Sequence, residues 1–174
     1  MANWTIETLH SEIGFKVRHL VISTVSGKFK AYDLKVETEK EDFTDAKVSF
    51  TADVNSVSTG VEQRDTHLKS ADFFDVQEYP KLTFISTDVV KDGSDYKLTG
   101  DLTIKNVTKS ITLDVELGGV GPNMYGQTVA GFEVSGKINR KDYGLMRNAV
   151  TEAGGVVVSD DVRLVINLEL IKEA

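Results

Sequence analysis

The chain has 174 residues, of which 40% are hydrophobic and 27% charged, and a formal net charge of -7. This composition is typical of a globular domain and excludes a disordered chain. The net negative charge opposes a phosphate backbone, which excludes nucleic acid as a partner. The absence of cysteine excludes disulfides, thiolate catalysis and zinc–cysteine sites.

No stretch rich in glycine, serine or proline divides the sequence, so we expect one domain over residues 1–174. The first residues lack the basic region and apolar run of a signal peptide, and no apolar run is long enough to cross a bilayer. We therefore expect a cytoplasmic protein that does not span a membrane. A periplasmic location after removal of a signal peptide stays open.

Alternation of apolar and polar residues predicts strands along most of the chain. In residues 13–19, for example, Phe15, Val17 and His19 all fall on the apolar side. Short turn clusters separate the runs, and a turn is expected at residues 19–26. The predicted strands are 13–19, 29–38, 48–54, 82–90, 98–104, 111–117, 129–138 and 162–171.

This pattern predicts an all-β fold of about eight antiparallel strands. Closure into an extended β-barrel removes the exposed strand edges that promote aggregation, and we prefer it to an open sheet. A two-sheet sandwich stays open as the alternative, because alternation alone does not separate a hollow interior from a filled one.

One segment breaks the strand pattern and predicts a short helix at residues 61–75. Arg64, Asp65, Leu68 and Asp72 recur there at spacings of three and four residues. Polar side chains stand beside the pair Phe73 and Phe74, as in a plug at the end of a barrel. A helix that covers one end of a closed sheet indicates an enclosed interior, so a binding cavity is the leading hypothesis.

Candidate ligand contacts follow from this hypothesis. Arg64 and His67, with Asp65, either orient a ligand head group or form a cap that holds the helix to the barrel. Asp142 either contacts the ligand or closes a turn, and the histidines have no metal-ligand spacing, so no metal site is expected. The remaining candidates are side chains expected in the interior, where they contact ligand or simply fill the core: Phe15, Val17, His19, Phe50, Phe73, Phe84 and Phe132.

An ordered set of motifs along nearly the whole chain resembles the YceI-like, polyisoprenoid-binding family. No single motif is decisive, but the set in this order is specific. The motifs are Trp4, His10–His19, Gly27–Phe29, Arg64–Leu68, Asp72–Asp75, Tyr79–Pro80, Gly100–Thr108 and Ile138–Gly144.

This resemblance implies an extended lipocalin-like barrel, with a helix at one side, around an elongated apolar tunnel for a long-chain isoprenoid or similar amphiphilic lipid. It implies binding, as in carriage or sequestration, without turnover and without a cofactor. If the lipid carries a phosphate head, the net negative charge of the protein opposes its binding. An arginine near the opening of the barrel would offset this charge, and the candidates are Arg18, Arg64, Arg140 and Arg147.

Two other functions stay open. One is an enzyme that uses His19, Asp65 and His67 as acid–base groups on a bound amphiphile. The other is a scaffold or interaction module with a filled core that binds no ligand. The oligomeric state is also open, with a homodimer as one option.

Overall fold

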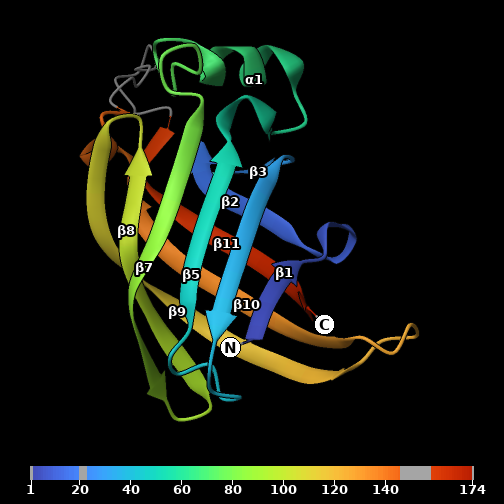
Figure 1. The fold of residues 1–174 in the computed structure, drawn as a ribbon. Coiled ribbons are helices and arrows are strands. Elements are labelled where there is room, and N and C mark those ends of the chain that lie inside the picture. The colour runs from blue at the N-terminus through green and yellow to red at the C-terminus, as the bar shows by residue number, and fades with distance from the viewer. Residues whose placement is uncertain (1, 20–22, 146–157, 174) are drawn as a thin grey trace.

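The protein is built almost entirely of strands, which confirms the all-β fold class (Figure 1). The computed structural model describes residues 2–19, 23–145 and 158–173, with only the backbone at His19 and Val158. The strands are β1 (Ala2–Ile6), β2 (Glu12–His19), β3 (Ser23–Phe29), β4 (Tyr32–Thr38), β5 (Lys47–Asp53), β6 (Val57–Ser58), β7 (Lys81–Asp92), β8 (Asp95–Ile104), β9 (Val107–Pro122), β10 (Thr128–Asn139) and β11 (Val158–Lys172). The helices are η1 (Thr8–His10), η2 (Val54–Ser56), α1 (Glu62–Lys69) and η3 (Arg140–Tyr143).

Strand pairing closes the sheet into a barrel. The neighbours run β1-β4-β5-β7-β8-β9-β10-β11, and β11 pairs with β1 again. This closing pair is antiparallel, with Trp4 opposite Lys172 and Ile6 opposite Leu170. Eight strands therefore form a closed antiparallel ring, as the sequence predicted, and the ring leaves no free edge at this level.

The remaining strands lengthen the barrel at one end. β1 and β2 both pair with β11, so they form one interrupted strand position. β3 and β4 form a second, since β3 pairs with β2 and β4 with β1. The predicted strand 29–38 is split at Lys30 and Ala31, whose amides donate to the Ser56 hydroxyl, while the Ala31 carbonyl accepts from the Asp53 amide at the end of β5.

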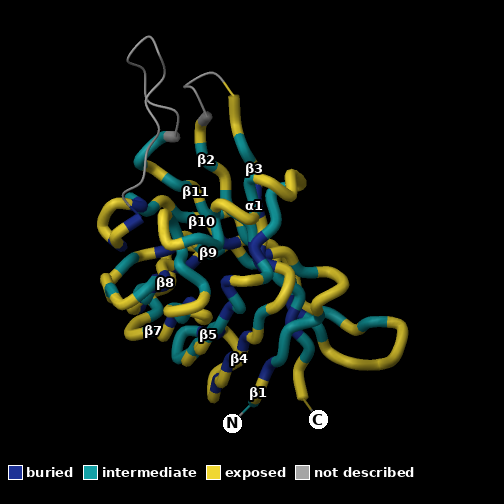
Figure 2. The backbone as a smooth tube through the Cα atoms, turned by 90° about the horizontal axis from the view of Figure 1, so that it is seen from above, coloured by how far each residue is buried: buried dark blue, intermediate teal, exposed yellow. Residues whose placement is uncertain are grey.

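Side-chain alternation divides the wall into an inner and an outer face. In β8, Tyr96, Leu98, Leu102 and Ile104 are all buried, and the polar residues between them are more exposed. Seen from the end that carries α1, exposed residues concentrate on the outer surface and the peripheral loops (Figure 2). The sequence pattern thus fixes which side chains face the interior.

The predicted helix is present but shorter than residues 61–75. α1 spans Glu62–Lys69 and lies over one end of the barrel (Figure 1). It ends because Ser70 is extended, with φ -75° and ψ 171°, and the Ser70 hydroxyl donates to the His67 carbonyl at 2.6 Å. Residues 23–26 of the turn predicted at 19–26 belong to β3 instead, and His19 ends β2; residues 20–22 lie outside the described part of the chain.

Two glycines let aromatic rings lie close against the inner wall. A Cβ added to Gly27 would lie 2.4 Å from Cζ of Phe15, the residue opposite it on β2. A Cβ added to Gly100 would lie 2.5 Å from Cζ of Phe84 and 2.6 Å from the Ile85 carbonyl oxygen. Because glycine leaves this space free, both rings stay near the wall rather than deeper in the interior.

The variant Gly27→Ala tests this packing. The new methyl group must displace the Phe15 ring, so we expect a loss of about 1–3 kcal/mol in the free energy of unfolding, measured by urea denaturation. Gly119→Ala is the control, because a Cβ there meets nothing within 4 Å. A change within about 0.5 kcal/mol is expected for it. Equal losses in the two variants would contradict the close approach of Phe15.

Candidate functional site

The barrel interior contains an apolar cavity of about 210 Å³, called here the main cavity. For comparison, an engineered apolar cavity of about 150 Å³ stays dry and binds benzene. The lining side chains come from the inner face of the strands and from the α1 segment. They include Ile13, Phe15, Val17, Phe29, Phe50, Leu68, Phe73, Phe74, Leu82, Phe84, Leu98, Leu102, Ile104, Ile111, Leu113, Val134, Ile138, Leu145, Val162, Leu164, Ile166 and Leu168.

The segment that carries α1 covers the main cavity with apolar side chains. Leu68, the last apolar residue of the helix, lines the cavity together with Phe73 and Phe74 from the turns that follow. The Phe74 ring packs edge-on against Phe29, with the ring centroids 6.1 Å apart. This cover consists of half-buried side chains on a short helix and turns, without strand pairing.

Arg140 is the one charged side chain among the described residues that line the main cavity. Its Nε donates to the Ser159 carbonyl at 3.0 Å, its Nη1 donates to the Leu145 carbonyl, and its Nη2 lies 3.6 Å from an Asp160 oxygen. Burial lowers the pKa of this guanidinium, and Asp160 opposes the shift. These contacts tie η3 to the start of β11 and hold a cation at the cavity wall.

A second apolar cavity of about 80 Å³ lies beyond the main one, towards the end of the barrel opposite α1; it is called here the lower cavity. The two cavities share five lining residues, so they are neighbours along the barrel. The shared residues are Leu34, Val48, Leu98, Val134 and Leu168.

Most of the predicted interior side chains do line a cavity. Phe15, Val17, Phe50, Phe73 and Phe84 line the main cavity, and Phe132 lines the lower one. Their contact with a ligand stays a prediction.

The other predicted contacts are not among the lining residues. Asp142 is exposed in the first turn of η3, and Arg64 and His67 point elsewhere, as described next. The side chain of His19 and all of Arg147 lie outside the described part of the structure.

The polar residues of α1 form a cap instead of facing the cavity. The Asp65 carboxylate accepts hydrogen bonds from the Thr59 amide at 2.8 Å and the Thr59 hydroxyl at 2.6 Å. Arg64 donates to the Thr59 hydroxyl and carbonyl oxygens, at 2.7 and 2.9 Å. His67 lies 2.9 Å from Asp72 and packs edge-on against Phe73. This geometry favours the structural interpretation of the cluster, in which it holds α1 to the chain after β6.

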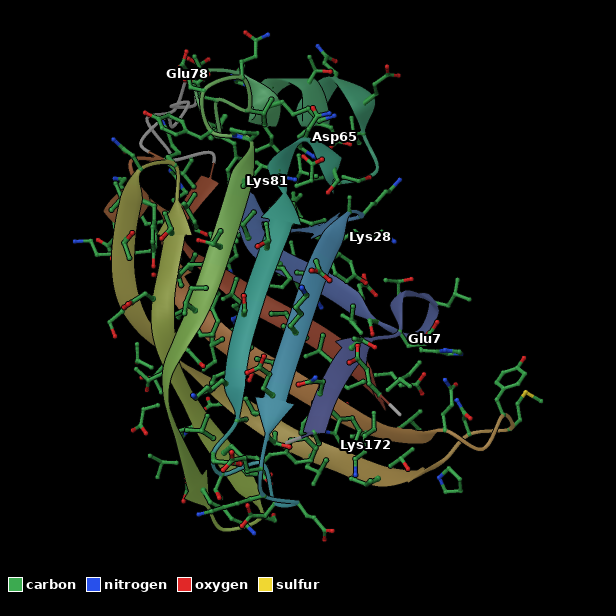
Figure 3. The ribbon with its side chains drawn as sticks, viewed as in Figure 1. Glu7, Lys28, Asp65, Glu78, Lys81 and Lys172 are labelled. Atoms are coloured by element: carbon green, nitrogen blue, oxygen red, sulfur yellow. The ribbon has the colours of Figure 1, made fainter. Side chains whose placement is uncertain are left out.

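One titratable cluster was missed by the sequence reasoning. Nδ1 of His10 lies 2.7 Å from a Glu7 oxygen and 3.2 Å from a Glu169 oxygen. Glu7 lies at the turn beside η1, far from Asp65 at the α1 end (Figure 3). Each residue offers one metal-ligand atom within 4.8 Å of the others, but their mutual hydrogen bonds already account for the arrangement. The cluster fixes the β1–β2 turn against β11.

This cluster shifts the ionisation of its members. The hydrogen bond to Glu7, with the charges of Glu169 and Glu7, raises the pKa of His10 above its ordinary value of 6.5. Desolvation works against the charged form of Glu7, yet the hydrogen bonds from His10 and Leu9 outweigh it and lower the pKa of this carboxyl.

Together, the fold and the cavities define a closed antiparallel β-barrel protein with a hollow apolar interior. Residues 4–170 match the YceI-like domain family. UPF0312 protein SAS2572 of Staphylococcus aureus (strain MSSA476) is 42% identical over 170 residues, which cover 97% of each chain. The chain therefore belongs to the YceI-like family, as its motifs predicted.

Solved structures share the same barrel. The YCEI protein of Campylobacter jejuni is similar, with a TM-score of 0.77 and 36% identity over 90% of both chains. A polyisoprenoid binding domain from Saccharophagus degradans has a TM-score of 0.69 at 17% identity and covers 98% of both chains. In the described part of this chain, no helix is long and apolar enough to cross a membrane.

The His10 cluster predicts a pH effect that NMR titration of the imidazole measures. Because the folded pKa of His10 is raised, its stabilising effect is present in acid and is lost as the pH rises through that pKa. We expect Glu7→Gln to lower the His10 pKa more than Glu169→Gln does, since the Glu7 hydrogen bond is the largest cause. An unchanged His10 pKa in Glu7→Gln would contradict the contact.

Proposed function

We propose that this protein binds the hydrocarbon chain of an isoprenoid or similar amphiphilic lipid in the main cavity, and that it carries or sequesters this lipid. The observation that carries the proposal is the interior of about 210 Å³, with apolar walls and a single charged residue among the described lining positions. A site of this kind selects hydrocarbon, because it offers almost no partner to a polar group.

The family supports the same ligand class. The chain is a YceI-like protein, and the same barrel occurs in a domain that binds polyisoprenoids. The fold alone does not define the ligand, so the argument depends on the cavity and its lining.

The energetics are adequate for binding through the chain alone. Each methylene moved from water to an apolar site contributes about 0.8 kcal/mol, and association costs roughly 4–15 kcal/mol. A chain of about 20 carbons would contribute roughly 16 kcal/mol before these costs. The head group then only needs to set the orientation of the lipid.

The position of Arg140 and the apolar cover over the main cavity support an orientation with the head group at the α1 end. Arg140 lies on the main cavity and its charge favours a polar or anionic head, although Asp160 offsets part of this attraction. The cover over this end consists of Leu68, Phe73 and Phe74, which lie on a short helix and turns outside the paired strands.

The polar geometry favours binding without turnover. Asp65 is held by Thr59, and His67 is held by Asp72, and neither lines a cavity among the described residues. An acid–base pair needs to reach the reacting group within hydrogen-bond distance, which these two residues do not approach in this arrangement. A filled scaffold is disfavoured by the two cavities. A cytoplasmic location and a homodimer remain separate predictions that the ligand class does not require.

Native mass spectrometry of protein purified without detergent tests the proposal. We expect an extractable long-chain lipid on the purified protein, and saturable binding of geranylgeraniol to protein stripped of lipid. Protein that carries no lipid after purification and also fails to bind isoprenoids in titration would contradict the proposal.

A matched pair of variants on β11 tests whether the binding site lies inside the barrel. Val162 lines the main cavity, whereas Val165 faces outward and is 38% exposed. We expect Val162→Trp to weaken geranylgeraniol binding at least about tenfold, because the indole occupies the space of several methylenes. Val165→Trp should bind within about twofold of the unmodified protein. Equal effects of both changes would argue for a surface site.

A further inference from the structure

The lower cavity has no role in the function proposed so far. It continues the main cavity past a ring of shared residues, Leu34, Val48, Leu98, Val134 and Leu168. Its lining is apolar apart from the Tyr96 hydroxyl, which is engaged elsewhere. A chain that fills the main cavity therefore meets further apolar space beyond this ring.

Phe43 forms the floor of the lower cavity. It comes from the loop of residues 39–46 between β4 and β5, and it is only 6% exposed. Its ring lies 5.2 Å from that of Trp4 and 5.2 Å from that of Phe132, centroid to centroid. These three aromatic rings close the end of the barrel opposite α1.

Hydrogen bonds within the loop and one from Tyr96 on β8 hold this floor in place. The Tyr96 hydroxyl donates to the Asp42 carbonyl at 2.6 Å, and the Ala46 amide donates to the Phe43 carbonyl at 3.1 Å. The Asp45 carboxylate accepts from the Glu39 amide at 2.7 Å and from the Lys40 amide at 3.2 Å.

Phe43 itself has a φ of 62°, in the left-handed region that a residue with a bulky side chain rarely adopts. Surrounding contacts must hold such a conformation, and here it directs the ring into the barrel. The floor is therefore held by these hydrogen bonds and by the packing of the Phe43 ring against Trp4 and Phe132.

We propose that the lower cavity receives the terminal segment of the bound chain and that Phe43 sets the longest chain the barrel accepts. This inference rests on the proposed function and adds a length limit to it. A lipid with its head at the α1 end extends its tail towards Phe43, and methylenes beyond the floor gain no buried contact.

Strand geometry gives the length of hydrocarbon chain that the two cavities can hold. The lining residues of β11 run from Val162 to Leu168 in the main cavity and to Leu170 in the lower one. At about 3.3 Å per residue and a tilt of about 40°, this path is roughly 20 Å along the barrel, of which the lower cavity supplies about 5 Å. The lower cavity therefore holds a few carbons at the end of the chain.

The test measures the affinity of the full chain, stripped of lipid, for farnesol, geranylgeraniol and longer all-trans homologues. For the unmodified protein, affinity should rise with chain length and then level off once the tail reaches Phe43. Ala46 lines the lower cavity, so Ala46→Leu replaces a methyl group by an isobutyl group in a space of about 80 Å³.

We expect Ala46→Leu to reach its plateau at a shorter chain, with a loss of about fourfold for each methylene that is excluded. Short homologues should bind unchanged. Ala31→Leu is the matched control, since Ala31 is exposed and lines neither cavity, and it should keep the plateau of the unmodified protein.

A smaller side chain at the floor has the opposite effect, because it enlarges the lower cavity. Phe43→Leu retains an apolar core residue and should move the plateau to a longer homologue, while circular dichroism checks that the variant is folded. Plateaus that coincide in Ala46→Leu, Phe43→Leu and the unmodified protein would overturn the length limit and leave the proposed function intact. If the unmodified protein binds no homologue at all, the proposed function fails and the length limit fails with it.

Discussion

Closure of the sheet creates an interior that the side chains of this protein do not fill, and the other features of the structure depend on this constraint. The β1–β11 pairing completes the ring and removes its edges. Phe15 and Phe84 then lie against glycines on the inner wall, which keeps their rings out of the centre. Both rings are part of the lining of the main cavity of about 210 Å³.

An empty apolar cavity has an energetic cost. Side chains that line an unfilled space have fewer packing contacts, and this lowers the stability of the fold. A hydrocarbon chain in the cavity would supply packing contacts to the lining side chains. The transfer of the chain itself from water to the apolar cavity would also be favourable. A ligand that occupies the cavity would therefore also stabilise the folded protein.

Sequence alternation predicted the barrel and most of its lining, because the two faces of a strand are determined by neighbouring residues. Phe50 and Phe84 are examples of side chains placed inward in this way. Residues outside the strands were predicted less well. Arg64 and His67 were candidates for ligand contact, but their direction is set by Thr59 and Asp72, which helical spacing does not identify.

Other features depend on contacts between distant parts of the chain. Glu169 reaches His10 only because β11 lies beside the β1–β2 turn, and no local pattern indicates this pair. Phe43 stands in a turn without periodicity, so its burial was not predicted. The short strand β1 was also missed as a partner of β11, although it completes the barrel.

The most direct test of a hydrocarbon-filled interior is an isotope-filtered NMR measurement of contacts between a bound isoprenoid and the methyl groups of the protein. The structure predicts contacts with Leu98 and Leu113 inside the barrel. It predicts none with Ile85 and Val165, which are exposed on the outer face of the wall. Contacts only with Ile85 and Val165, or none to the interior leucines at saturating ligand, would contradict the account.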